Sequence, residues 1–89
     1  MAREEIFGPV ICLMKPFKTM EEALERANDT NYGLAGGIFT SNMNIAEKCT
    51  RELHFGTVWV NNYNWTPCWA PFGGMKESGF GRDNCYETM

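Results

Sequence analysis

A glycine-rich stretch late in the sequence has the composition of a phosphate-binding loop. Residues 73–82 read GGMKESGFGR, which places Lys76 among four glycines. A Walker loop needs glycine directly before its lysine and serine or threonine directly after it, and these positions hold methionine and glutamate. The GFG at 79–81 also lacks the third glycine of a dinucleotide-binding loop, because position 84 is asparagine. The spacing therefore favours a tight loop that packs against a partner outside this sequence.

Cysteine and histidine are the other residues that could bind a metal or act as a nucleophile. Cys12, Cys49, Cys68 and Cys85 are 37, 19 and 17 residues apart, and His54 is the single histidine. Zinc sites need closely spaced ligand pairs, so we expect no metal site. We expect reduced thiols, with Cys12 and Cys49 packed in the core. We expect His54 to lie on the surface in the last turn of a helix and not to act as a base.

Composition and charge exclude several classes of protein. The sequence has 89 residues, of which 44% are hydrophobic, and a net charge of −3. A chain of this size is one domain at most and buries about 60–65% of its unfolded surface. The acidic balance argues against a nucleic-acid partner. The length is also too small for an enzyme that carries its own nucleotide-cofactor domain.

Membrane insertion and secretion are not expected either. The longest apolar run, residues 10–14, is far shorter than the roughly 20 residues that cross a bilayer. The first ten residues carry mixed charges, unlike a signal peptide. We therefore expect a cytoplasmic protein with no membrane partner.

Apolar periodicity predicts the elements that would position these residues. Residues 10–14 are continuously apolar, which predicts a strand buried on both faces. A capping box at 19–22 then starts a helix with Thr19 as its N-cap, and turn-forming residues end it at 28–31. Its predicted apolar stripe consists of Met20, Ala23, Leu24 and Ala27.

A second helix and two further strands follow. Residues 34–39 and 57–61 are predicted strands, and Gly36-Gly37 indicates that another group packs close to the first of them. Ser41-Asn42 caps the intervening helix, which Gly56 follows. Its apolar stripe consists of Ile45, Ala46, Cys49 and Leu53.

This order predicts a βαβαβ fragment of a parallel sheet, hence the α/β class, followed by a long tail. Right-handed crossovers place both helices on one face of the sheet, which leaves the other face bare. Residues 62–89 form the tail, which is rich in glycine and aromatic residues and shows no helix or strand period. Loops of this length are usually functional or disordered, and this one is too aromatic for a disordered linker, so we expect it to lie against a surface. We therefore interpret residues 1–89 as a single partial domain with an irregular tail at 62–89.

Three stretches together identify a family. Residues 4–10 read EEIFGPV, residues 27–35 read ANDTNYGLA, and residues 72–83 read FGGMKESGFGRD. Their order and spacing resemble the aldehyde dehydrogenase superfamily over essentially the whole chain. The run NNYN at 61–64 most resembles the betaine-aldehyde and 4-trimethylaminobutyraldehyde branch.

The resemblance implies a reaction and roles for individual residues. The family oxidises an aldehyde to a carboxylic acid with NAD or NADP as the hydride acceptor, through a cysteine adduct and a thioester that a glutamate helps to hydrolyse. Glu5 matches the glutamate that binds the nicotinamide-ribose hydroxyls, and Phe7 matches the aromatic residue beside the nicotinamide. The matching substrate-pocket residues are Asn64, Trp65, Thr66 and Phe72.

Other family features have no counterpart here. The catalytic cysteine, the general-base glutamate and the cofactor domain lie upstream in the family, and none of the four cysteines matches the catalytic motif. Cys85 stands where the family usually has glycine. We therefore expect a C-terminal fragment of the catalytic domain, inactive alone, from a family that forms homodimers or homotetramers. The alternative is a non-enzymatic module that docks onto a full-length dehydrogenase oligomer.

Overall fold

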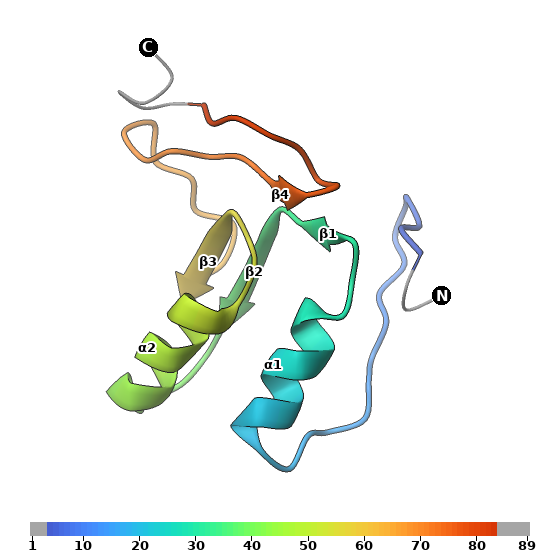
Figure 1. Ribbon diagram of the computed structural model, residues 1–89, viewed down its shortest axis with the longest axis vertical. Coiled ribbons are helices and arrows are strands. Elements are labelled where there is room, and N and C mark those ends of the chain that lie inside the picture. Colours follow the sequence, from blue (N-terminus) through green and yellow to red (C-terminus); the bar gives the residue numbers. More distant parts are fainter. Residues whose placement is uncertain (1–3, 84–89) are drawn as a thin grey trace.

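The computed structural model describes residues 4–83, which form two helices and two small sheets (Figure 1). Cys85 lies outside the described residues. The elements in chain order are α1 (Met20–Asn28), β1 (Tyr32–Gly33), β2 (Ala35–Ile38), α2 (Met43–Glu52), β3 (Thr57–Val60) and β4 (Met75–Lys76). The parallel sheet joins β2 to β3, and the antiparallel sheet joins β1 to β4.

Side-chain caps start both helices, as predicted. The Thr19 hydroxyl accepts a hydrogen bond from the backbone N–H of Glu22 at 3.2 Å, which satisfies one free donor of the first turn of α1. The Asn42 side-chain oxygen accepts from the N–H groups of Asn44 and Ile45, at 2.9 and 3.4 Å, at the start of α2. Both predicted N-termini are therefore confirmed.

The core lies between the two helices and the parallel sheet. Leu24, Cys49 and Leu53 are its buried centre, so both predicted helix stripes face inward. The Cys49 sulfur lies 3.4 Å from the sulfur of Met20. Burial raises the pKa of the Cys49 thiol, because the thiolate would lose its hydration. The partly buried side chains around this centre are those of Met20, Ala27, Ile38, Ile45, Phe55 and Val58.

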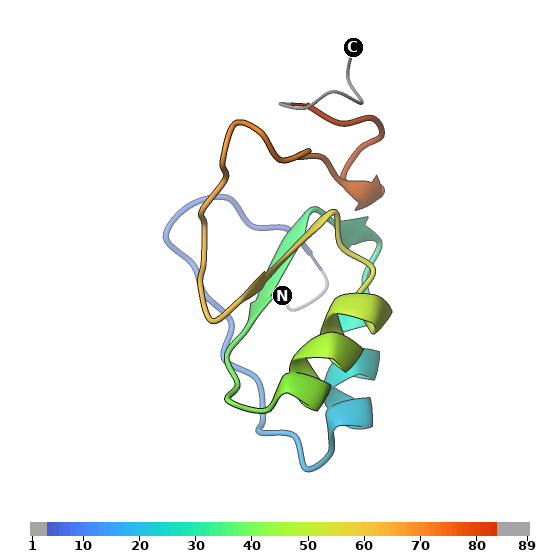
Figure 2. The same cartoon turned by 90° about the vertical axis from the view of Figure 1, so that its left-hand side faces the viewer.

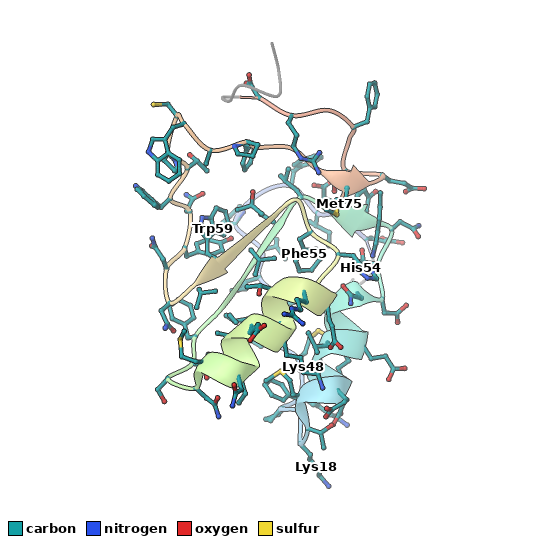
Figure 3. The ribbon with its side chains drawn as sticks, turned by 60° about the vertical axis from the view of Figure 1, so that its left-hand side comes forward. Lys18, Lys48, His54, Phe55, Trp59 and Met75 are labelled. Atoms are coloured by element: carbon teal, nitrogen blue, oxygen red, sulfur yellow. The ribbon has the colours of Figure 1, made fainter. Side chains whose placement is uncertain are left out.

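The parallel strand pair supports the predicted α/β class. β2 pairs with β3 in register, from Ala35 opposite Thr57 to Ile38 opposite Val60, and α2 connects them. Both helices lie on the same side of this pair, as predicted (Figure 2). A Cβ atom on Gly36 would lie 2.5 Å from the Phe55 ring, so the predicted close approach at this glycine is confirmed. Figure 3 shows Phe55 between the sheet and the end of α2.

The predicted strand at 10–14 is wrong in this structure. The segment has no strand partner among the described residues and lies apart from the strand pair (Figure 1). Ile11 and Leu13 are 83% and 90% exposed, and Cys12 is also exposed, so its predicted core position is wrong. A continuous apolar run becomes a strand only where hydrogen-bonding and packing neighbours exist. Here the core is too small to provide them.

The tail covers part of the sheet face that we expected to be bare. Trp59 is buried on the face away from the helices (Figure 3), and its indole N–H donates to the backbone carbonyl of Trp65 at 2.7 Å. The Tyr63 ring packs edge-on against Trp59 at 5.1 Å between ring centroids. The prediction of a bare face is therefore wrong at Trp59.

Candidate functional site

The three sequence stretches that carry the resemblance meet at one cavity. The cavity has a volume of about 450 Å³, and polar side chains from each stretch line it. Glu5 comes from the first stretch, Tyr32 from the second, and Glu77 from the third. Residues from distant parts of the sequence therefore share a single site, which we call the site cavity. Its lining residues are Glu5, Thr30, Tyr32, Gly33, Leu34, Ala35, Phe55, Glu77 and Ser78.

Three consecutive tail residues hold one wall of the site cavity in place. The Lys76 ammonium donates to the backbone carbonyls of Asn28 and Thr30, at 3.0 and 3.1 Å. The backbone N–H of Glu77 donates to the carbonyl of Asn31 at 2.9 Å. We call the residues Lys76, Glu77 and Ser78 the clamp, and the segment 30–35 the cavity wall.

The third clamp contact reaches a buried glycine. The N–H of Gly33 donates to the Ser78 hydroxyl at 2.8 Å. The pairing of β1 with β4 sets this register, with Gly33 opposite Met75. Figure 3 shows Met75 in β4 beside the β1 strand. The clamp therefore bonds to the chain from the end of α1 to the middle of the cavity wall.

The same wall is fixed from its other side by the chain that follows α2. The carbonyls of Gly33 and Leu34 accept from the N–H groups of Gly56 and Thr57, at 3.0 and 3.1 Å. A Cβ atom on Gly33 would lie 2.5 Å from the carbonyl oxygen of His54, so only glycine fits there. The cavity wall is thus held between the clamp and the start of β3.

His54 itself is exposed, which confirms the predicted surface position. It follows α2 instead of lying in its last turn, because the helix ends at Glu52. Its backbone N–H donates to the Asn28 side chain at 2.9 Å. Its contribution is therefore structural in this geometry, since the bond links the ends of the two helices.

The two predicted cofactor-binding residues differ in their position relative to the site cavity. Glu5 is exposed and lines the site cavity, which places its carboxylate where a ligand can reach it. Phe7 is 88% exposed and is not among the lining residues. The structure therefore brings Glu5, but not Phe7, to the cavity.

The four predicted substrate-pocket residues do not line either cavity that we describe in residues 4–83. Asn64, Trp65 and Thr66 are consecutive and exposed, and the rings of Trp65 and Trp69 meet edge-on at 6.2 Å. Phe72 is partly buried and pairs through its backbone with Asp83. Neither of these two cavities therefore brings Phe72 together with residues 64–66, and their role in a substrate pocket stays a prediction.

A second and larger cavity was not predicted from the sequence. It has a volume of about 690 Å³ and opens between residues 14–17, α1 and β2. Its lining is mostly apolar and includes Phe17, Leu24, Ile38 and Phe39.

Within the described residues 4–83, no group of three or more histidine, cysteine, aspartate or glutamate residues is placed to hold a metal ion. Neither helix in this range is both long and apolar enough to cross a bilayer.

Sequence reasoning missed the polar residues that share the site cavity with Glu5. Thr30, Tyr32, Glu77 and Ser78 all lie inside the resembling stretches, yet their types alone indicate turns or exposed surface. The available signal was that the stretches 27–35 and 72–83, which contain these residues, match the same family as the stretch that contains Glu5.

Comparison with known proteins links the whole chain to one family. Residues 1–89 match the aldehyde dehydrogenase family. The betaine aldehyde dehydrogenase of Mesorhizobium japonicum is 52% identical over 89 residues, which is all of this chain and 18% of that enzyme. The 4-trimethylaminobutyraldehyde dehydrogenase of Rattus norvegicus is 54% identical over 87 residues, which is 98% of this chain and 17% of that enzyme.

Solved structures give the same result. The betaine aldehyde dehydrogenase of Staphylococcus aureus in complex with NAD⁺ is 42% identical, and its TM-score to this chain is 0.91. The match covers 97% of this chain and 17% of that one. The present chain therefore spans 17% to 18% of the length of these relatives.

Proposed function

Because the chain belongs to the aldehyde dehydrogenase family, we propose that it forms the C-terminal part of the catalytic domain of an enzyme that oxidises an aldehyde to a carboxylic acid. The observation that carries the proposal is the meeting of all three family stretches at the site cavity. The match of the whole chain to relatives five to six times longer supports its status as one part of such an enzyme.

Glu5 is proposed to bind the nicotinamide ribose of NAD or NADP. Its exposed carboxylate lines a cavity of about 450 Å³, within the size range of small-molecule sites. A carboxylate accepts hydrogen bonds from two vicinal hydroxyls, so it would orient the sugar. The cofactor, when bound, accepts the hydride. Phe7 is proposed to lie beside the nicotinamide, and its exposed ring is available for this contact.

Asn64, Trp65, Thr66 and Phe72 are proposed to contribute to the aldehyde pocket. The names of two relatives include betaine aldehyde and 4-trimethylaminobutyraldehyde, which share a trimethylammonium group. A quaternary ammonium is attracted to the faces of aromatic rings, and the Trp65 side chain is 57% exposed. We therefore propose a trimethylammonium aldehyde as the substrate class.

The 89 residues alone are proposed to be inactive. Cys49 is buried, and neither Cys12 nor Cys68 lines the site cavity with Glu5. We propose that the catalytic cysteine and the general-base glutamate come from another part of the enzyme, as the family resemblance implies. We further propose that the complete enzyme is a cytoplasmic homodimer or homotetramer, as expected for the family.

A chimeric enzyme tests this function. The matched segment of the Mesorhizobium japonicum relative is replaced by these 89 residues, and NADH formation from betaine aldehyde is followed by absorbance. We expect turnover by the chimera and none by the isolated chain. A folded chimera that forms no NADH from either trimethylammonium aldehyde or from simple aliphatic aldehydes would contradict the proposal.

A docking function is the second candidate, and the exposed apolar surface favours it. Phe7, Leu13 and Phe80 are 88%, 90% and 100% exposed. Such a surface suits a contact with a full-length dehydrogenase oligomer. Co-elution of the purified chain with that oligomer, together with an inactive chimera, would favour docking over catalysis.

A further inference from the structure

The clamp gives the tail a role in the cofactor site itself. We propose that Lys76 and Ser78 are positioning residues for the nicotinamide cofactor, because they hold the cavity wall in the shape that lets Glu5 and the wall face the same ligand. This inference rests on the proposed function. It assigns to the tail a task beyond covering the sheet.

Ser78 is the more enclosed of the two contacts. Its side chain is partly buried, and its hydroxyl accepts from the N–H of the buried Gly33. Behind it, a Cβ atom on Gly74 would lie 2.7 Å from the Ser78 Cβ, so glycine at 74 allows the serine to reach this position. Removing the hydroxyl takes away the partner of this backbone donor, and the bond is only partly buried. The wall would therefore shift until the Gly33 N–H finds another acceptor, such as water.

Lys76 holds the beginning of the same wall. Its ammonium bridges the carbonyls of Asn28 and Thr30, at the negative C-terminal end of α1, where a cation is favoured. The backbone of Lys76 has a φ of 54°, a left-handed conformation that non-glycine residues rarely adopt. Such a conformation persists where surrounding contacts fix it, and here the turn is closed by the Ser78 N–H donating to the Met75 carbonyl at 3.1 Å.

These contacts are separate from the core that holds the fold together. The buried centre consists of Leu24, Cys49 and Leu53, and none of the three clamp side chains belongs to it. Loss of a clamp contact should therefore change the cavity wall more than the stability of the fold. This separation distinguishes a positioning role from a purely structural one.

The test uses the chimera with Ser78→Ala and Lys76→Met. For each variant we expect the KM for NAD and the Kd for NADH, measured by fluorescence titration, to rise about threefold to tenfold, the effect of losing one hydrogen bond. The KM for the aldehyde, kcat and the melting temperature should stay close to those of the chimera. Hydrogen exchange of the Gly33 amide should become faster in Ser78→Ala without cofactor.

Matched control variants lie away from the site cavity. Thr50→Val removes a hydroxyl that donates to the Glu47 carbonyl within α2, and Lys48→Met removes an ammonium paired with Glu21. Figure 3 shows Lys48 on α2, well away from Met75. Both controls should keep cofactor affinity within about twofold. Lys76→Arg retains a cationic donor and should recover most of the affinity that Lys76→Met loses.

The outcomes separate this inference from the proposed function. An inactive chimera would count against the function. An active chimera in which both clamp variants bind NADH as tightly as the controls would overturn the inference. A clamp variant with a raised KM for the aldehyde and a lowered melting temperature, together with weaker cofactor binding, would also overturn it. Such a combined effect would indicate a purely structural role.

Discussion

Glu5 is the residue on which the proposed cofactor site depends. It lines the site cavity from the first family stretch, while the clamp and the cavity wall come from the other two. Its neighbour Glu4 is also exposed but does not line the cavity, so the two carboxylates differ in position and not in chemistry. This pair offers a test at the scale of single residues.

Glu5→Gln in the chimera should raise the KM for NAD by roughly fivefold to tenfold, because a neutral amide oxygen forms weaker hydrogen bonds with hydroxyls than a carboxylate does. Steady-state kinetics at saturating aldehyde give the value. Glu4→Gln is the matched control and should have little effect. Equal effects of the two substitutions on the KM for NAD would contradict the proposed role of Glu5 in cofactor binding.

The thiols offer a second test at this scale. Burial raises the pKa of Cys49, so the fraction of reactive thiolate at mildly alkaline pH is reduced, and the fold also blocks access. In the isolated chain, iodoacetamide should label the exposed Cys12 and Cys68 well before Cys49. Peptide mass spectrometry over time gives the order. Early labelling of Cys49 would show that the core between the helices is not formed.

The helices show which parts of the fold can be predicted from local sequence. Thr19 and Asn42 cap them as expected, and their apolar stripes face the core, because caps and helical periods depend on residues within a few positions of one another. The segment 10–14 shows the opposite case. Its apolar run predicts a strand, but strand formation depends on a distant neighbour that the described residues do not provide.

The α2 cap can be tested directly. Asn42→Ala removes the side-chain acceptor for two N–H groups and should destabilise the first turn by about 1 kcal/mol. In the chimera, amide exchange in residues 43–47 should become roughly fivefold faster. Asn44→Ala, two residues later, is the control and should leave exchange nearly unchanged, because alanine favours the helix. Equal exchange in the two variants would contradict the cap.

The same distinction applies to the site: a residue within one contiguous motif can be located from the sequence, whereas contacts between distant segments cannot. Resemblance located Glu5, because its motif is contiguous in the sequence. The clamp could not be found this way, since its bonds join residues 28–33 to residues 76–78, and only the β1–β4 register determines which of them meet. The substrate-pocket residues remain a prediction, because the structure does not bring Phe72 to residues 64–66 in a described cavity.

At the scale of the whole molecule, the chain has a small core and extensive apolar surface. Four apolar side chains are buried among the described residues, while the large apolar cavity and side chains such as Phe39 and Phe80 remain accessible. Large apolar side chains exposed in such number are typical of a surface that packs against another part of a protein. The family match over 17% to 18% of its relatives gives a physical reason, because the rest of such an enzyme would cover these surfaces.

The rate of NADH formation from betaine aldehyde by the chimera is the most direct test of the proposed function. We expect a rate comparable to that of the unmodified relative, loss of cofactor affinity in Glu5→Gln, and no NADH from the isolated 89 residues. A correctly folded chimera that binds neither NAD nor aldehyde, or an isolated chain that turns over with all four cysteines replaced, would contradict it.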